Sequence, residues 1–446
     1  MSIIKRIKGV QRQHLAWYLY DFGNSAYAAV VLLAIYSAYF KGEVVGGAEG
    51  SRLWGIAVGI AMLTVAVTSP VLGTIADFSA SKKRFLILFS SMTWLFTALL
   101  FLVEKGDVLT GMLFFILAEI GYRSGQVFYN SLLPEIAEPE EMGRVSGNGW
   151  AIGSAGGILC LLIILPPIVL SEGNLWVRLS FIITAVFFAI STLPTLFWIK
   201  EKARPQPLPN GENYVSMGFK RIIKTIRSVR HFREFLKFIV AFLIYNDGIL
   251  MAMDFAAIIG AVLYGMNQQQ LILFMIVVQV TSVAGAYVFT IVGERKGYKR
   301  SLVFSLLLML VTIFWMMVNP SLEGYFMIGA LAGFALTGVQ AISRTMVGYF
   351  APRGQSAEFF GFFAVAGRTS SFIGPTVYGI LAAEAALYFQ GQGLGDLLAE
   401  QMGQRVAIAS IAIFLIVGLV ILLRVNEDKA RQAALDISHE LAAEGD

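Results

Sequence analysis

The sequence predicts an all-α integral membrane protein of about twelve transmembrane helices, and three observations support this prediction. Of the 446 residues, 57% are hydrophobic and only 14% are charged, and the mean hydropathy is +0.72. A soluble globular protein has about 45–50% apolar and about 25% charged residues, so the excess apolar surface must be buried against lipid. Long apolar runs also recur along the whole chain, with one polar connector in the middle.

A membrane-spanning helix requires about 20 mostly apolar residues. The run at 356–390 is longer than this, so we expect one tilted helix with an irregular tail ending at Gly391 to Gly395. We read the basic start at Met1 to Lys8 as leading into a permanent helix, because no small-residue cleavage site follows the first apolar stretch. The twelve predicted spans are 14–40, 53–76, 85–103, 109–133, 146–170, 176–199, 236–262, 268–292, 301–319, 323–350, 356–390 and 404–425.

The polar connector carries a basic amphipathic pattern. Within it, apolar residues recur at helical spacing for more than three turns among lysines and arginines. The pattern predicts an interfacial helix at 218–233 that binds anionic lipid headgroups, and a plain basic linker is the alternative. The predicted domains are an N-terminal six-helix bundle at 1–199, a cytoplasmic linker at 200–235, a C-terminal six-helix bundle at 236–425 and a cytoplasmic tail at 426–446.

The distribution of positive charge predicts the orientation of the chain. With both termini in the cytoplasm, the cytoplasmic segments hold 26 of the 34 lysines and arginines, and the opposite side holds five. Cytoplasmic segments of membrane proteins carry such an excess. We therefore expect a multi-pass protein with cytoplasmic N- and C-termini, in a bacterial inner membrane.

The second half of the chain repeats features of the first half. An acid followed by basic residues comes after spans two and eight, a proline ends spans four and ten, and a tyrosine with an acid lies in spans one and seven. Two related halves are common in transporters, whose solute site lies at the interface of the repeats. The paired residues are Asp77 and Glu294, Pro134 and Pro352, and Tyr20–Asp21 and Tyr245–Asp247.

Ionisable and amide side chains lie within several predicted spans. Such residues are costly in a bilayer, usually functional, and must face a water-filled cavity or each other. Spans one, four, seven and ten hold most of them, which predicts that these four spans line a central cavity. The candidates for binding the solute or a proton are Asp21, Asn24, Glu119, Arg123, Asn130, Asn246, Asp247, Asp254, Gln340, Arg344 and Arg368.

These candidates differ in the alternatives they leave open. Asp21 and Asp247 each lie close to a glycine and could carry a proton across, or could cap a helix or lock the halves together. Glu119 and Arg123 are spaced i, i+4 and could simply neutralise each other. Asp254 could pair with an arginine only to hold the halves together. The arginines suit a solute carboxylate or phosphate, and with the acids they suit a zwitterion.

Two sets of motifs carry a resemblance to known families. The six-plus-six layout and the loop from Gly73 to Asp77 with its basic cluster resemble the major facilitator superfamily. The chain departs from the usual pattern at three positions. In the first loop Phe78 stands in place of a basic residue and Ala80 in place of a glycine, and in the second loop Thr290 replaces the leading glycine. The resemblance implies a cytoplasmic gate. Its residues would be Asp77, Lys82, Lys83, Arg84, Glu294, Arg295 and Arg300.

A narrower resemblance covers nearly the whole chain. The motifs are similar to those of the vacuole-effluxer branch, which includes fungal vacuolar amino-acid effluxers linked to autophagy and bacterial relatives. The resemblance implies solute transport, with amino acids as the favoured class. The motifs are Trp17 to Tyr27, Tyr245 to Gly248, Gly338 to Arg344, Phe359 to Gly361, and Gly374–Pro375.

The sequence thus predicts a secondary active transporter rather than an enzyme, with a small solute and protons as its partners. No Walker-type nucleotide loop occurs, and the single cysteine and three histidines lack metal-ligand spacing, so we expect no cofactor and no metal. We expect a monomer that binds no nucleic acid. A lipid-directed membrane enzyme is the first alternative, but it would need a cluster of His, Asp or Ser at one membrane face. A non-transporting receptor or scaffold is the second.

Overall fold

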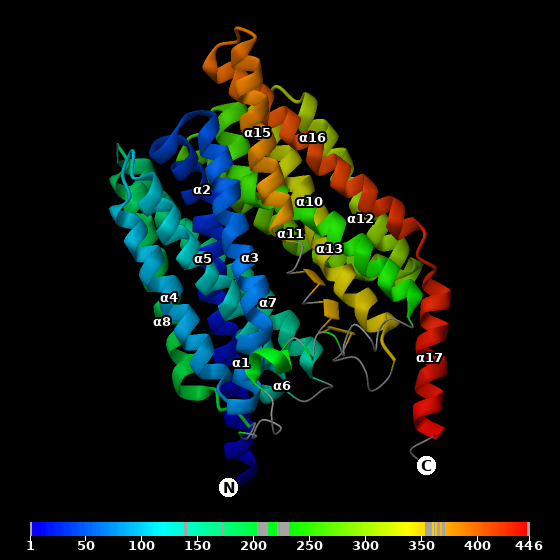
Figure 1. The fold of residues 1–446 in the computed structure, drawn as a ribbon. Helices are drawn as coiled ribbons and strands as arrows, with labels where there is room; N and C mark the ends of the chain where they lie inside the picture. Colours follow the sequence, from blue (N-terminus) through cyan, green and yellow to red (C-terminus); the bar gives the residue numbers. More distant parts are fainter. Residues whose placement is uncertain are drawn as a thin grey trace. The chain divides into compact units, whose positions relative to one another are not determined.

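The computed structural model is built from helices (Figure 1). No strand occurs among the residues whose structure is described. These residues are 2–137, 141–171, 173–202, 205, 213–218, 220, 223, 232–352, 359–360, 362–363, 366–367 and 371–443. Most of the expected interfacial helix at 218–233 lies outside them.

Eleven helical stretches of the described chain are long and apolar enough to cross a membrane, which confirms the predicted all-α membrane class. The eleventh expected run, 356–390, lies partly outside the described residues and contains the 19-residue helix α15 (Ile373–Gly391). The predicted irregular tail ending at Gly391 to Gly395 is confirmed, because α15 ends at Gly391, the chain turns, and α16 begins at Asp396. The turn has a physical cause, since Gly393 has a φ of 89°, which favours glycine.

Contacts between residues divide the chain into two compact units. The first comprises Met1–Phe219, Asp254–Ala261 and Gly265–Ile276, and the remainder forms the second. The long helix α10 (Arg233–Tyr264) therefore contributes to both units. The expected bundle boundaries at 199 and 236 stay a prediction.

The first unit contains the helices of the first six predicted spans. Its first span is irregular, because two π-helical stretches, η1 (Ala28–Ala34) and η2 (Phe40–Val45), interrupt it on either side of α2. Such widened turns are rare and are frequent at functional sites. The other elements are α1 (Ser2–Tyr27), α2 (Tyr36–Tyr39), α3 (Gly47–Ser79), α4 (Lys82–Leu99), η3 (Leu100–Leu102), α5 (Val108–Ser131), α6 (Leu133–Ile136), α7 (Met142–Leu170) and α8 (Leu175–Trp198).

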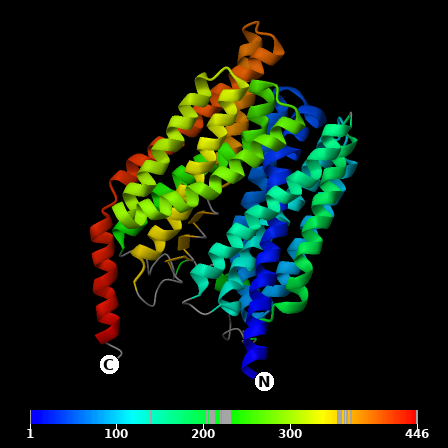
Figure 2. The same cartoon turned by 180° about the vertical axis from the view of Figure 1, so that it is seen from behind.

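The second unit repeats this arrangement with the later helices. Helix α12 packs against α13 and α16, and α15 packs against α16 (Figures 1 and 2). Ser321 begins α13 by accepting a hydrogen bond from the Gly324 amide at 3.0 Å, so a side chain satisfies one of the free amides of that helix end. The elements not yet bounded are α11 (Gln268–Lys296), α12 (Tyr298–Val318), α13 (Leu322–Phe350), α16 (Asp396–Leu423) and α17 (Glu427–Ala443).

Glycines allow the close helix contacts in both units. In the first, α1 packs against α7, and a Cβ built on Gly156 would lie 2.7 Å from the carbonyl carbon of Phe22. In the second, a Cβ on Gly374 would lie 2.7 Å from the carbonyl oxygen of Asp247. Phe22 lies two residues after Tyr20, and Asp247 lies two residues after Tyr245. The two close contacts therefore occur at corresponding positions of the two halves.

The α1–α7 contact generates the first testable prediction. We expect Gly156→Ala to lower the thermal unfolding temperature in detergent, because the added methyl group meets backbone and overpacking costs about 1–3 kcal/mol. Gly147→Ala on the same helix is the matched control, since a Cβ there meets nothing within 4 Å. Equal unfolding temperatures for the two variants would contradict close packing at Gly156.

Candidate solute-binding site

A buried ion pair on α5 is the centre of the candidate site. The Nε–H of Arg123 donates to Glu119 Oε1 at 2.6 Å, and the Tyr27 hydroxyl of α1 donates to Glu119 Oε2 at 3.0 Å. The Glu119 side chain has no exposed surface, whereas 23% of the Arg123 side chain is exposed. Both oxygens of Glu119 thus accept a hydrogen bond, and Arg123 is the more exposed member of the pair.

Aromatic rings surround this ion pair. The Tyr27 and Tyr122 ring centroids are 4.6 Å apart, and the Arg123 guanidinium carbon lies 5.4 Å from the Tyr122 ring centroid. A cation near an aromatic ring gains electrostatic attraction, and the gain increases when water is excluded. The Tyr122 ring therefore lies near the guanidinium without using its terminal nitrogen atoms.

Asp254 of α10 lies within electrostatic range of Arg123 and Glu119, in the part of α10 that belongs to the first unit. Only 2% of Asp254 is exposed, and its Oδ2 has no hydrogen-bond partner among the residues described. The indole N–H of Trp54 on α3 donates to the backbone carbonyl of Asp254 at 2.8 Å. Two acids and one arginine from two helices thus come together in one apolar region.

Other predicted residues of the first unit lie around this centre. Asp21 is half-buried on α1, against Gly153 of α7. Asn24 is buried, and its Oδ1 has no hydrogen-bond partner within the described part of the chain. Asn130 is exposed near the end of α5. Glu119 of α5 is therefore buried, whereas Asn130 of the same helix is exposed.

The second unit brings together several of its predicted residues. Gln340 donates to Asn246 at 3.3 Å, and the Tyr245 and Ser343 hydroxyls are 2.7 Å apart. Asp247 is buried at the level of Gly374. Arg344 is exposed, and Arg368 lies outside the described residues.

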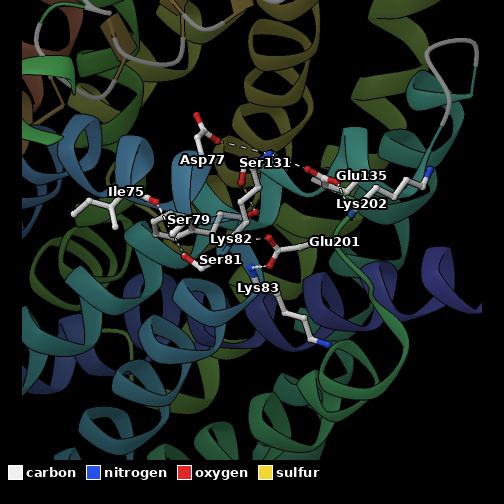
Figure 3. Close-up of polar contacts among 11 residues, drawn as sticks. Ile75, Asp77, Ser79, Ser81, Lys82, Lys83, Ser131, Glu135, Glu201 and Lys202 are labelled. Carbon is white, nitrogen blue, oxygen red and sulfur yellow. Dashed lines mark hydrogen bonds and ion pairs between the residues drawn. The ribbon is translucent and has the colours of Figure 1, made fainter. Parts of the chain in front are cut away.

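The loop that the sequence analysis assigned to a gate forms a network at one end of the first unit (Figure 3). Lys82 Nζ lies 3.7 Å from Asp77 Oδ1 and 3.0 Å from Glu135 Oε1. Glu135 Oε2 also accepts from the Lys202 amide at 2.9 Å. Arg84, which was expected in the same gate, is exposed.

Beside this network, α4 and α8 are joined by what we call the first clamp, formed by Lys83 and Glu201. Glu201 accepts from the Lys82 and Lys83 amides at 3.1 and 2.5 Å, which satisfies free amides at the start of α4 (Figure 3). Lys83 Nζ donates to the Leu196 and Ile199 carbonyls at 2.6 and 2.8 Å, which satisfies the end of α8.

A second clamp, Lys299 and Glu427, joins α12 and α16 in the same way. Glu427 accepts from the Tyr298 and Lys299 amides at 3.2 and 3.4 Å, and Lys299 Nζ donates to the Leu423 and Val425 carbonyls at 2.9 and 2.6 Å. The gate residues expected in this half, namely Glu294, Arg295 and Arg300, are exposed, and their role in a gate stays a prediction.

The sequence analysis did not single out several residues of the site and the clamps. One signal in the sequence could have revealed the two clamps. The ends of predicted spans six and twelve are alike, because Glu201 and Glu427 each lie two residues after an aliphatic residue. Trp54 gave no such signal, because an indole in an apolar span is typical of packing. The missed residues are Tyr27, Trp54, Glu135, Glu201 and Glu427.

The repeated helical architecture and the buried polar centre define a membrane transporter of the major facilitator type. The chain belongs to the family described as vacuole effluxer Atg22-like, whose model matches residues 54–435. This confirms the resemblance found in the sequence.

Relatives of known name agree with this class. The chain is 26% identical to the uncharacterized MFS-type transporter YxiO of Bacillus subtilis, over 95% of this chain and 96% of that protein. It is 23% identical to autophagy-related protein 22-1 of Aspergillus niger, over 67% of this chain and 49% of that protein. The chain thus spans about half the length of this fungal relative.

Solved structures share the fold. A bacterial homolog of the human lysosomal transporter Spinster, in an inward-facing conformation, matches with a TM-score of 0.67 and 13% identity, over 96% of this chain and 98% of that one. The nucleoside transporter NupG matches with a TM-score of 0.70 and 12% identity, over 93% of this chain and 99% of that one. At this identity the likeness concerns the fold alone.

The first clamp generates a prediction about stability. We expect Glu201→Ala to lower the thermal unfolding temperature, because removing a helix-capping acceptor costs about 0.5–2 kcal/mol. Glu201→Gln keeps one acceptor oxygen and should lie between the alanine variant and the wild type. Glu323→Ala, at an exposed acid, is the control. An unfolding temperature for Glu201→Ala equal to that of the control would show that the clamp adds nothing.

The turn between α3 and α4 generates another prediction. Ala80 has a φ of 48°, the left-handed region that costs a non-glycine residue about 1–2 kcal/mol. We expect Ala80→Gly to raise the thermal unfolding temperature, and Ala66→Gly, inside α3, to lower it. A lower unfolding temperature for Ala80→Gly would contradict strain at this turn.

Proposed function

We propose that the chain is a secondary active transporter that moves an amino acid, or a related zwitterion or organic anion, by alternating access coupled to protons. Membership of the vacuole-effluxer family supports solute transport. The names of two fold neighbours, a nucleoside transporter and a D-xylose–proton symporter, support a small solute and, in one case, protons.

The proposed substrate class rests on the hydrogen bonding of Arg123. Among the described residues it makes one hydrogen bond, through Nε to Glu119, so its terminal nitrogens remain for a ligand. A guanidinium is always charged and presents a planar fork that matches a carboxylate. An arginine in a membrane span costs about 3 kcal/mol, which favours a functional reason for its presence.

The acids supply the complementary half of the proposed site. Asp21 and Asn24 of α1 are proposed to contact the amino end of the solute, and Asn246 and Asp247 of α10 are proposed as the polar groups of the second unit that bind solute or a proton. An ammonium group carries three donors and no acceptor, so it needs carboxylate or amide oxygens. Asp247 and Asn24 are buried polar groups on apolar helices, as such a role requires.

The direction in which the chain is inserted is part of the proposal. The excess of lysine and arginine in the predicted cytoplasmic segments supports cytoplasmic N- and C-termini. We further propose that the protein works as a monomer in a bacterial inner membrane. In that case both clamps lie on the cytoplasmic side, where Lys83 and Lys299 add to the positive charge.

Substituting Arg123 tests the proposed substrate class. We expect Arg123→Gln to reduce uptake of a radiolabelled mixture of the proteinogenic amino acids into proteoliposomes to background, and Arg123→Lys to reduce it about tenfold or more, because lysine lacks the planar fork. Arg424→Gln, at an exposed arginine, is the control.

A second variant separates loss of binding from loss of folding. Breaking a buried ion pair on one side costs about 3–5 kcal/mol, so Arg123→Gln could fail through unfolding. The double variant Glu119→Gln with Arg123→Gln removes both charges, and we expect it to fold and still not to transport. Wild-type uptake by the double variant would refute a carboxylate-binding role for Arg123.

A further inference from the structure

The buried centre of the first unit contains one more negative than positive charge. Glu119 and Arg123 neutralise each other at 2.6 Å, and the Tyr27 hydroxyl occupies the second oxygen of Glu119. Asp254, within electrostatic range of both, adds the uncompensated carboxyl group. An ionised carboxylate away from water is strongly destabilising unless it is paired or neutralised.

Asp254 has the geometry of a group that takes up a positive charge. It is 2% exposed, and its Oδ2 has no hydrogen-bond partner within the described structure. The charged groups in its range are Arg123 and Glu119 of α5, while α3 contributes the neutral indole of Trp54. The open oxygen therefore marks the place where a single positive charge is missing.

We propose that Asp254 binds the proton that drives transport, an inference that rests on the proposed function. A proton on Oδ2 converts the carboxylate into a neutral acid and needs no additional ligand. An ammonium group would need about three acceptors, yet both oxygens of Glu119 are already bonded. The buried oxygen atoms thus favour a proton over the amino end of the solute at this position.

Arg123 links this proton site to the solute. The same guanidinium lies in electrostatic range of Asp254 and offers its terminal nitrogens to a solute carboxylate. A solute carboxylate bound to Arg123 adds a further negative charge near Asp254, which favours the protonated form of Asp254. Binding of the anion and binding of the proton therefore strengthen each other, and such coupling is reciprocal.

Trp54 holds Asp254 in this position. Its indole N–H donates to the Asp254 carbonyl oxygen at 2.8 Å, and its fully buried ring lies 4.4 Å from the Phe115 ring, centroid to centroid. Trp54 is a positioning residue, because it contacts the backbone of Asp254. Trp54→Phe keeps a smaller aromatic ring and removes the donor without changing any charge, which makes it a test of position rather than of charge.

Infrared difference spectroscopy tests the proton site without any solute. We expect wild-type protein in detergent, moved from neutral to acidic buffer, to gain the C=O band of a protonated carboxyl group. Asp254→Asn should lack that component, whereas Asp428→Asn, at an exposed acid of α17, should keep it. An unchanged band in Asp254→Asn would overturn the proposal.

Transport by the same variants separates this inference from the proposed function. With the radiolabelled amino-acid mixture, Asp254→Asn should lose accumulation driven by a proton gradient but keep exchange across the membrane without a gradient. Loss of both in the folded variant would assign Asp254 to the solute and overturn its role as the proton site. If the wild type moves no amino acid, the proposed substrate class fails, and the infrared result still decides on the proton.

Trp54→Phe completes the set. We expect it to keep exchange and to shift the pH at which the carboxyl band appears, because the position of Asp254 relative to Arg123 changes. Phe115→Leu, which alters the ring contact but leaves the hydrogen-bond donor in place, is the matched variant and should shift it less. No shift in Trp54→Phe would refute the positioning role of the indole.

Discussion

The free energy of an ionised group away from water is the constraint on which this structure depends. An apolar helix can carry Glu119 and Arg123 only because the two are hydrogen-bonded to each other and because Tyr27 satisfies the remaining carboxylate oxygen. That requirement fixes how α1 and α5 face each other at this level. It also makes Asp254 exceptional, since the pair beside it is already neutral.

Backbone groups at helix ends impose a second constraint, and the two halves of the chain satisfy it in the same way. Each clamp uses one glutamate for the amides at the start of a helix and one lysine for the carbonyls at the end of another. The paired helices, α4 with α8 and α12 with α16, are thereby joined at one end. The two clamps thus place the same kind of contact at corresponding helix ends of each half.

Much of the fold could be predicted from the sequence because bilayer thickness restricts the length and polarity of each span. The paired Tyr20 and Tyr245 likewise revealed the repeat, and both hydroxyls are bonded to a serine of a neighbouring helix.

The site was harder to predict. Helical spacing put Glu119 and Arg123 on one face, but spacing within one helix says nothing of Tyr27, Trp54 or Asp254, which come from other helices. The clamp of the second half was also hard to predict, because it is formed by Glu427, which is more than a hundred residues away in sequence from Glu294. The role of Glu294 in a gate stays a prediction.

The charges of the buried centre also bear on selectivity. A neutral solute such as a sugar or nucleoside would leave the terminal nitrogens of Arg123 without an anion, and a site with unpaired buried polar groups rejects such ligands strongly. An amino acid bound with one proton would supply one carboxylate to Arg123 and one positive charge to Asp254. The centre, the proton and the carboxylate and ammonium groups of the solute would then together hold three positive and three negative charges. The planar fork of Arg123, rather than charge balance, is thus the reason for proposing a carboxylate-bearing solute, and neutral solutes are named for other proteins with this fold.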